Sequence, residues 1–129
     1  MADTPTVLVI DDDAGFRAYV RAALGSTVRV VEGDDGEAAL GLALRERPDV
    51  ILLDWRMPGQ NGITTCRALR AEPSLAGVRI AMITALDDER DRTLARHAGA
   101  DAFIVKDPDP DALAAQIHRL LPPSEARTA

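Results

Sequence analysis

Hydrophobic residues in this chain gather in short runs that alternate with amphipathic segments. Five such runs are rich in Val, Ile and Leu and stop at charged or hydroxyl residues, a pattern typical of β-strands in a buried sheet. The predicted strands cover residues 6–10, 28–31, 50–54, 78–83 and 102–105. The run at 28–31 mixes apolar residues with an arginine, so we expect it at an edge of the sheet, half exposed.

The segments between these runs repeat apolar residues at helical spacing. Helices are predicted up to Gly25, over 37–45, over 63–71, from 87 to Gly99, and last in a segment that carries Leu113, Ile117, Leu120 and Leu121 and stops at Pro122. Five alternations of strand and helix predict an α/β fold, with a doubly wound parallel sheet, helices on both faces and right-handed crossovers. Residues 1–121 are expected to form one domain, and 122–129 a tail or the start of a linker.

The ends of the predicted strands carry the candidate chemistry. These end residues are Asp11, Asp12 and Asp13 after the first strand, Asp54 after the third, Thr84 after the fourth and Lys106 after the fifth. Because parallel strands deliver their carboxyl ends to one edge, we expect these groups to converge there. Carboxylates in such a cluster repel one another unless a cation lies among them, and an all-oxygen site favours Mg²⁺.

A carboxylate beside a hydroxyl and an ammonium is suited to receive a phosphoryl group. Asp54 would supply the attacking oxygen, Thr84 would donate a hydrogen bond, and Lys106 and the metal would neutralise the phosphoryl oxygens. Each residue also has an ordinary structural interpretation, since Asp12 or Asp13 could simply cap the next helix. The combination of four suitable strand ends favours the phosphoryl site.

Composition and charge disfavour several kinds of binding partner. The 15 basic and 21 acidic residues give a net charge of −6, which disfavours direct binding to nucleic acid or to an anionic membrane. The longest apolar stretch, residues 38–44, is too short to span a bilayer. The single cysteine suits a reducing compartment, and the start of the chain does not have the pattern of a secretory signal, so a cytoplasmic location is expected.

Four motifs together resemble the receiver domain of two-component response regulators. They are Asp-Asp after the first strand, Leu-Leu-Asp-Trp-Arg-Met-Pro-Gly around the third, Ile-Thr-Ala at the fourth and Phe-Ile-Val-Lys at the fifth. The resemblance runs from about residue 6 to residue 121. It implies a flavodoxin-like sheet in the order 2-1-3-4-5 with five helices.

The resemblance also implies roles by position. Asp54 would be the phospho-acceptor, taking its phosphoryl group from a phosphohistidine on a sensor histidine kinase or phosphotransfer protein. Asp12, Asp54 and the backbone carbonyl of Arg56 would bind Mg²⁺ directly, and Asp11 would act through water. Thr84 and Lys106 would contact the phosphoryl oxygens.

Phe103 matches the switch aromatic of the family, expected to turn inward as the residue at Thr84 moves. One departure is Asp107, because many members have proline after the lysine; Lys-Asp looks more like receivers joined to helix-turn-helix output domains. Another is Gln60-Asn61-Gly62, where Met-Asp-Gly is commoner. Neither departure removes a residue of the phosphoryl site.

The leading hypothesis is therefore a signalling switch that catalyses only its own phosphorylation and dephosphorylation and then contacts an output domain or target protein. Homodimer formation stays open. A Mg²⁺-dependent phosphohydrolase or phosphotransferase of another α/β class is the second hypothesis, although such enzymes usually have Asp-x-Asp-x-Thr where this chain has Asp11-Asp12-Asp13-Ala14-Gly15. A flavin or nucleotide binder ranks last, because no Gly-rich phosphate loop follows Ile10.

Overall fold

A computed structural model describes residues 4–56, 61–85 and 87–122. Its strands are β1 (Thr6–Ile10), β2 (Arg29–Gly33), β3 (Val50–Asp54), β4 (Arg79–Thr84) and β5 (Ala102–Val105). Its helices are α1 (Ala14–Leu24), α2 (Gly36–Glu46), α3 (Gly62–Ala71), α4 (Glu89–Ala98) and α5 (Pro110–His118), with 3-10 turns η1 (Gly25–Thr27) and η2 (Pro73–Leu75). Within the described ranges no helix has the length and apolar character of a membrane span.

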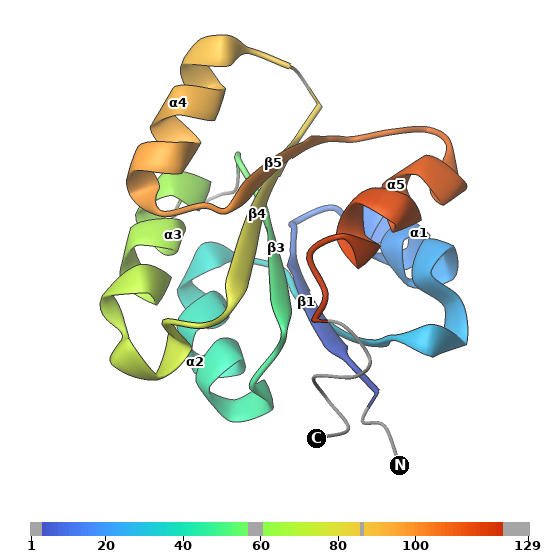
Figure 1. Ribbon diagram of the computed structural model, residues 1–129, viewed down its shortest axis with the longest axis horizontal. Coiled ribbons are helices and arrows are strands. Elements are labelled where there is room, and N and C mark those ends of the chain that lie inside the picture. Colours follow the sequence, from blue (N-terminus) through green and yellow to red (C-terminus); the bar gives the residue numbers. More distant parts are fainter. Residues whose placement is uncertain (1–3, 57–60, 86, 123–129) are drawn as a thin grey trace.

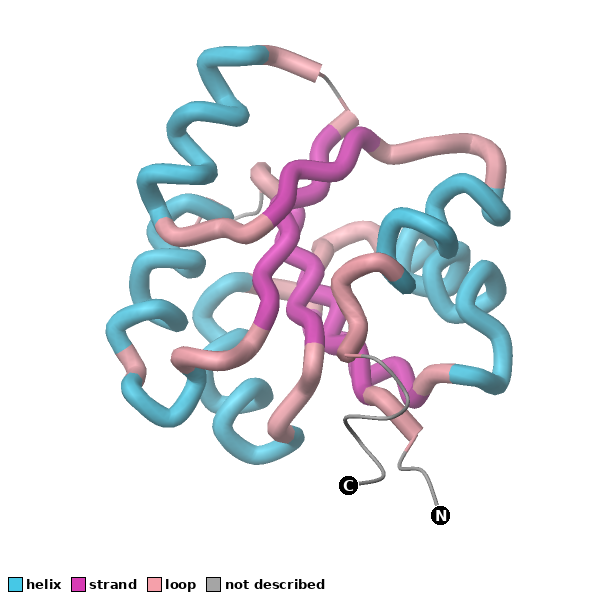
Figure 2. The backbone as a smooth tube through the Cα atoms, in the orientation of Figure 1, coloured by secondary structure: helices cyan, strands magenta, loops and turns pink. Residues whose placement is uncertain are grey.

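All five strands are parallel and lie in the order β2-β1-β3-β4-β5, which confirms the expected fold. Figure 2 shows the sheet running through the molecule with helices on both sides. The edge position of β2 is also confirmed, and the strand mixes exposed residues with buried ones. The central strands β1 and β3 are buried along their whole length, because both of their faces are covered.

Two apolar cores fill the space between sheet and helices. One lies under α2, α3 and α4, and the other lies under α1 and α5 (Figure 1). Successive residues of β3 alternate between them: Ile51 and Leu53 face the first core, and Val50 and Leu52 face the second. This alternation directs Asp54, the next residue in phase, toward the α1 and α5 side.

Within the described ranges, each α-helix begins at an Asp or Asn whose side-chain oxygen accepts a backbone N–H of the first turn. The five N-caps are Asp13, Asp35, Asn61, Asp88 and Asp109. The predicted helix boundaries are correct to within a residue or two, except at the last helix. That helix ends at His118, while Leu120 and Leu121 pack against the second core from the turn that follows. Residues 123–129, expected as a tail or linker, lie outside the described ranges.

Candidate functional site

The strand register brings two of the predicted acids together. Ile10 of β1 pairs with Leu53 of β3, so the residues that follow them, Asp11 and Asp54, are neighbours across the sheet. Carboxylate oxygens of Asp11, Asp12 and Asp54 all lie within 4.8 Å of one another. Asp11 is 1% exposed and Asp54 is 9% exposed, whereas Asp12 faces solvent. Two carboxylates of the cluster are therefore buried and one borders the solvent.

Asp13, the third acid of the sequence run, has the structural role that the sequence left open. Its carboxylate accepts the backbone N–H of Gly15 at 2.8 Å and caps α1. Its own N–H donates to Oδ1 of Asp11 at 2.9 Å. The run of three aspartates thus divides into two members of the cluster and one helix cap, and the cap also fixes the orientation of Asp11.

Lys106 reaches the cluster from the end of β5. Its Nζ lies 3.1 Å from Oδ2 of Asp11 and 3.7 Å from Oδ1 of Asp54. The peptide N–H of Lys106 donates to the carbonyl of Thr84 at 2.7 Å, which places Thr84 at the same edge of the sheet. Thr84 is half-buried and ends β4. The structure therefore gathers the predicted acids, hydroxyl and ammonium at one edge.

The electrostatics of Asp54 reflect this crowding. The pKa of its carboxyl group is raised to about 6, mainly by burial and also by the charges of Asp11 and Asp12, and this value already includes the opposing effect of Lys106, which lowers the pKa. Oδ2 of Asp11 is buried and accepts no hydrogen bond, although the Lys106 ammonium is close. Three carboxylates against one ammonium leave an excess of negative charge. An added cation with oxygen ligands would relieve this excess, so the donor set fits a hard divalent ion such as Mg²⁺.

The backbone around Asp54 is also held closely. The N–H of Trp55 donates to the carbonyl of Ile83 at 3.0 Å, and the N–H of Gly62 donates to the carbonyl of Trp55 at 2.9 Å. A Cβ atom at Gly62 would lie 2.5 Å from the carbonyl oxygen of Asp54, so only glycine allows this approach. Arg56, whose carbonyl is the predicted third metal ligand, is exposed two residues after Asp54. That ligand role stays a prediction.

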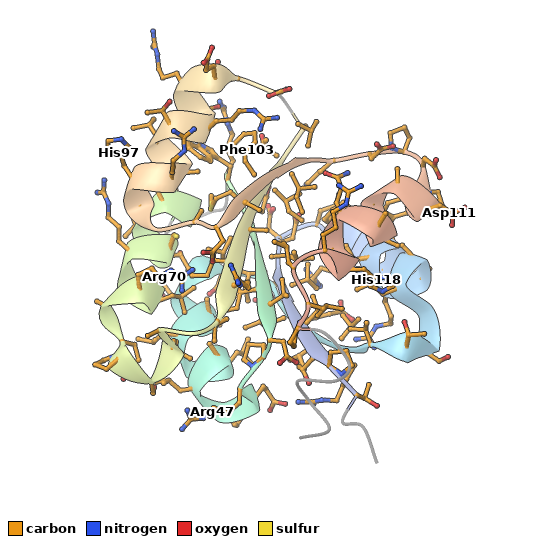
Figure 3. The ribbon with its side chains drawn as sticks, in the orientation of Figure 1. Arg47, Arg70, His97, Phe103, Asp111 and His118 are labelled. Atoms are coloured by element: carbon orange, nitrogen blue, oxygen red, sulfur yellow. The ribbon has the colours of Figure 1, made fainter. Side chains whose placement is uncertain are left out.

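Phe103 lies on the other face of the sheet, where it is half-buried (Figure 3). Its ring makes an edge contact with Trp55, with centroids 6.3 Å apart, and the guanidinium of Arg92 lies 4.8 Å from its centroid. Arg92 also forms an ion pair with Asp87 at 2.6 Å, in the loop between β4 and α4. The aromatic side chain expected to switch is thus in contact with the residue after Asp54 and with α4.

Some neighbours of the site were not identified from the sequence. Arg17 of α1 donates to the carbonyl of Asp11 at 2.6 Å and pairs with Glu32 of β2 at 3.0 Å. Arg92 was likewise missed, because its partners are distant in sequence or in the preceding loop. A surface arginine at helical spacing carries no signal that separates these roles from solvent exposure.

Residues that the sequence analysis left outside the site also lie outside it in the structure. Figure 3 shows His97 on α4 and His118 on α5, on opposite sides of the molecule, and both are exposed. Cys66 of α3 is fully buried, and burial raises the pKa of its thiol to about 11. It is therefore a packing residue and not a reactive thiol.

Comparison with known proteins gives a consistent result. The family model of the response regulator receiver domain matches residues 7–118. The chain is 40% identical over 116 residues to the DNA-binding response regulator MtrA of Mycolicibacterium paratuberculosis, covering 89% of this chain and 50% of that protein. It is 37% identical over 115 residues to the response regulator PleD of Caulobacter vibrioides, covering 88% of this chain and 25% of that protein.

A solved structure also matches. The chemotaxis protein CheY4 of Vibrio cholerae superimposes with a TM-score of 0.86 at 28% identity, over 92% of this chain and 100% of that one. The present chain therefore spans between a quarter and a half of the two curated relatives, but the full length of this solved structure.

Proposed function

Because the chain belongs to the receiver-domain family of response regulators, we propose that it is a phospho-accepting switch of a two-component system. The observation that carries the proposal is the arrangement at the sheet edge. A buried carboxylate, that of Asp54, lies 3.7 Å from the Lys106 ammonium and beside two further aspartates. Membership of this family favours the switch over the two alternative classes, the phosphohydrolase and the flavin or nucleotide binder.

The proposed reaction is a transfer between nitrogen and oxygen. A carboxylate oxygen of Asp54 attacks the phosphorus of a phosphohistidine, a P–O bond forms as the P–N bond breaks, and the imidazole leaves with the electron pair and takes up a proton. In the absence of a metal ion, a pKa of about 6 leaves Asp54 mostly ionised at pH 7. Lys106 would pair with the phosphoryl oxygens, and Thr84 would donate a hydrogen bond to them.

The acidic cluster is proposed to hold Mg²⁺. Asp12, Asp54 and the carbonyl of Arg56 would be its direct ligands, and Asp11 would act through water. When bound, the ion supplies positive charge against the phosphoryl oxygens. The support is the excess of negative charge in the cluster and the buried Oδ2 of Asp11 that accepts no hydrogen bond.

Signal output is proposed to follow from the change of charge at Asp54. Thr84 would move toward the phosphoryl group, and Phe103 would turn inward into the space that Thr84 vacates. Phe103 already contacts Trp55 and Arg92, so its movement would change the contacts of the sheet with α4. Water attack on phosphorus later releases inorganic phosphate and restores the carboxylate. The chain would therefore act once per phosphorylation and would not be a turnover enzyme.

Response regulators interact with histidine kinases and output domains. For this chain we propose a sensor histidine kinase or phosphotransfer protein as donor and a separate output domain or target protein as recipient, in the cytoplasm. Residues 1–121 would be the receiver and 122–129 the beginning of a tail or linker. The net charge of −6 supports the proposal that the receiver itself does not contact DNA. Homodimer formation on phosphorylation is compatible with this scheme.

The decisive experiment is intact mass spectrometry after incubation with Mg²⁺ and acetyl phosphate, a small acyl phosphate. Wild-type chain should gain one base-labile phosphoryl group, and Asp54→Asn should gain none. Because rapid hydrolysis could hide the adduct, a beryllium fluoride titration followed by Trp55 emission accompanies it. If wild-type chain forms no adduct and shows no response to beryllium fluoride while folded, the proposed function is wrong.

A further inference from the structure

Two aromatic residues of α1 lie against the segment that carries Lys106. Phe16 and Tyr19 are three residues apart and so share one face of the helix, and their ring centroids are 6.1 Å apart. Both rings are half-buried against the core under α1 and α5. The chain has only one Trp, one Tyr and two Phe, so two aromatic residues together on one helix call for a specific explanation.

Phe16 contacts the ammonium group directly. Nζ of Lys106 lies 4.4 Å from the centroid of the Phe16 ring, within the range of a cation–π interaction. The same Nζ faces Asp11 and Asp54. The uncharged ring is therefore a third contact of the ammonium group, beside the two carboxylates. Together these contacts hold a long, flexible side chain in one place. Unlike a third carboxylate, the ring attracts the ammonium without adding negative charge to the cluster.

Tyr19 acts on the backbone next to Lys106. Its hydroxyl donates to the carbonyl oxygen of Asp107 at 2.8 Å, and the N–H of Lys106 donates to the carbonyl of Thr84 at 2.7 Å. The peptide unit before Lys106 is thus held by β4, and the peptide unit that follows Asp107 is held by α1. Asp107 lacks the ring that restrains φ in proline, so the path of the chain here depends on such contacts.

We propose that Phe16 and Tyr19 form an aromatic clamp that positions Lys106 for phosphoryl transfer to Asp54. Phe16 holds the ammonium, and Tyr19 holds the backbone one residue after Lys106. This inference rests on the proposed function. Both aromatic residues are positioning residues, because Lys106 is the group that would touch the phosphoryl oxygens.

The clamp predicts kinetic coupling to Lys106. We would measure the rate of phosphorylation by acetyl phosphate with Mg²⁺, by intact mass, in otherwise wild-type chain and in Lys106→Ala. Phe16→Leu should slow the wild-type reaction roughly 2- to 5-fold, the equivalent of a partly exposed cation–π contact. Tyr19→Phe should slow it roughly 2- to 10-fold, the equivalent of one hydrogen bond. In Lys106→Ala, neither change should slow the reaction further.

Two control variants separate positioning from general loss of structure. Phe16→Tyr keeps an aromatic face and should keep the wild-type rate. Leu24→Val removes buried volume from the same helix, away from the acidic cluster, and should lower stability without changing the rate. A second measurement needs no phosphorylation: the ε-methylene protons of Lys106 should show an upfield ring-current shift by NMR that Phe16→Leu abolishes and Leu24→Val preserves.

The outcomes are distinct for the two proposals. Slowing that disappears without Lys106, together with loss of the ring-current shift, supports the clamp. Rates unchanged by both substitutions, or slowed equally with and without Lys106, overturn the clamp and leave the proposed function intact. Wild-type chain that forms no adduct and ignores beryllium fluoride refutes the proposed function itself.

Discussion

In the absence of a metal ion, the buried charge of Asp54 should make wild type less stable than a variant with a neutral residue at this position. Asp54 is 9% exposed and lies beside Asp11 and Asp12, so ionisation in the folded state is unfavourable. Asp54→Asn removes that charge and keeps the shape of the side chain. We therefore expect the substitution to stabilise the fold in the absence of divalent cations, although it removes the predicted phospho-acceptor.

The magnitude follows from the pKa. A folded pKa of about 6 against the ordinary value of 3.8 corresponds to about 3 kcal/mol at pH 7 and above. This value already includes the attraction between Asp54 and Lys106, because that attraction lowers the pKa from which the value is derived. For a chain of 129 residues, 3 kcal/mol would raise Tm by roughly 10 °C.

The effect has a defined pH dependence. Because the pKa is higher in the folded state, the folded protein binds the Asp54 proton more tightly than the unfolded chain does. The stabilisation from this proton is complete below about pH 3.8 and is lost as pH rises through about 6. The advantage of Asp54→Asn should therefore be small near pH 4, grow between pH 4 and 6, and be constant above pH 7.

Urea unfolding in EDTA, across this pH range, is the appropriate assay. Asp34→Asn is the matched control, because Asp34 is an exposed carboxylate outside the cluster and its replacement should change the free energy of unfolding by less than about 0.5 kcal/mol. If Asp54→Asn proved no more stable than wild type at pH 7.5 in EDTA, the reasoning from crowded, buried charge would be refuted.

Three further predictions concern the same architecture. Mg²⁺ at ten times its dissociation constant should stabilise wild type by about 1.4 kcal/mol and Asp12→Asn by much less, as measured by thermal shift. Arg70→Ala should cost about 2–4 kcal/mol in urea unfolding, because Arg70 donates to the carbonyls of Gly99 and Val78 and pairs with Asp101; a loss under 0.5 kcal/mol would contradict this. Gly62→Ala should destabilise the fold by more than about 2 kcal/mol, because the added Cβ would clash with the Asp54 carbonyl. Gly41→Ala is the control, and it should be neutral or stabilising because Gly41 lies in open space on α2. Equal effects of the two substitutions would refute the steric argument.

Much of the fold could be predicted from the sequence because its strands are unusually clear. Val50 to Leu53 are four large apolar residues in succession, which favours a strand covered on both faces. The order of the strands could not be predicted from the apolar pattern and was implied only by the family resemblance. The last helix shows the limit of periodicity. Leu120 and Leu121 continue the apolar spacing, yet they pack from a turn, because contact with the core needs no helix.

Some residues of the site could likewise be predicted from the sequence, and others could not. Asp11, Asp54 and Lys106 could be predicted together because each lies at the carboxyl end of a strand, and parallel strands end at one edge. Contacts that depend on side-chain reach could not be predicted. Arg17 extends from α1 to the carbonyl of Asp11, and Arg92 lies over Phe103, and both depend on how helices are placed on the sheet. Helix placement is set by the packed cores, which the apolar pattern does not specify residue by residue.

The path of the chain after α5 determines where a domain joined to its end would begin. Leu121 and Pro122 line a groove of about 600 Å³ together with Asp49 and Arg79, which lie at the amino ends of β3 and β4. Asp54 lies at the carboxyl end of β3, five residues away along an extended strand, or roughly 17 Å. A domain joined beyond Pro122 would start at the opposite pole from the phosphoryl group. At that starting point, phosphorylation of Asp54 would act at a distance, through small shifts of the close-packed layers between the two ends of the sheet.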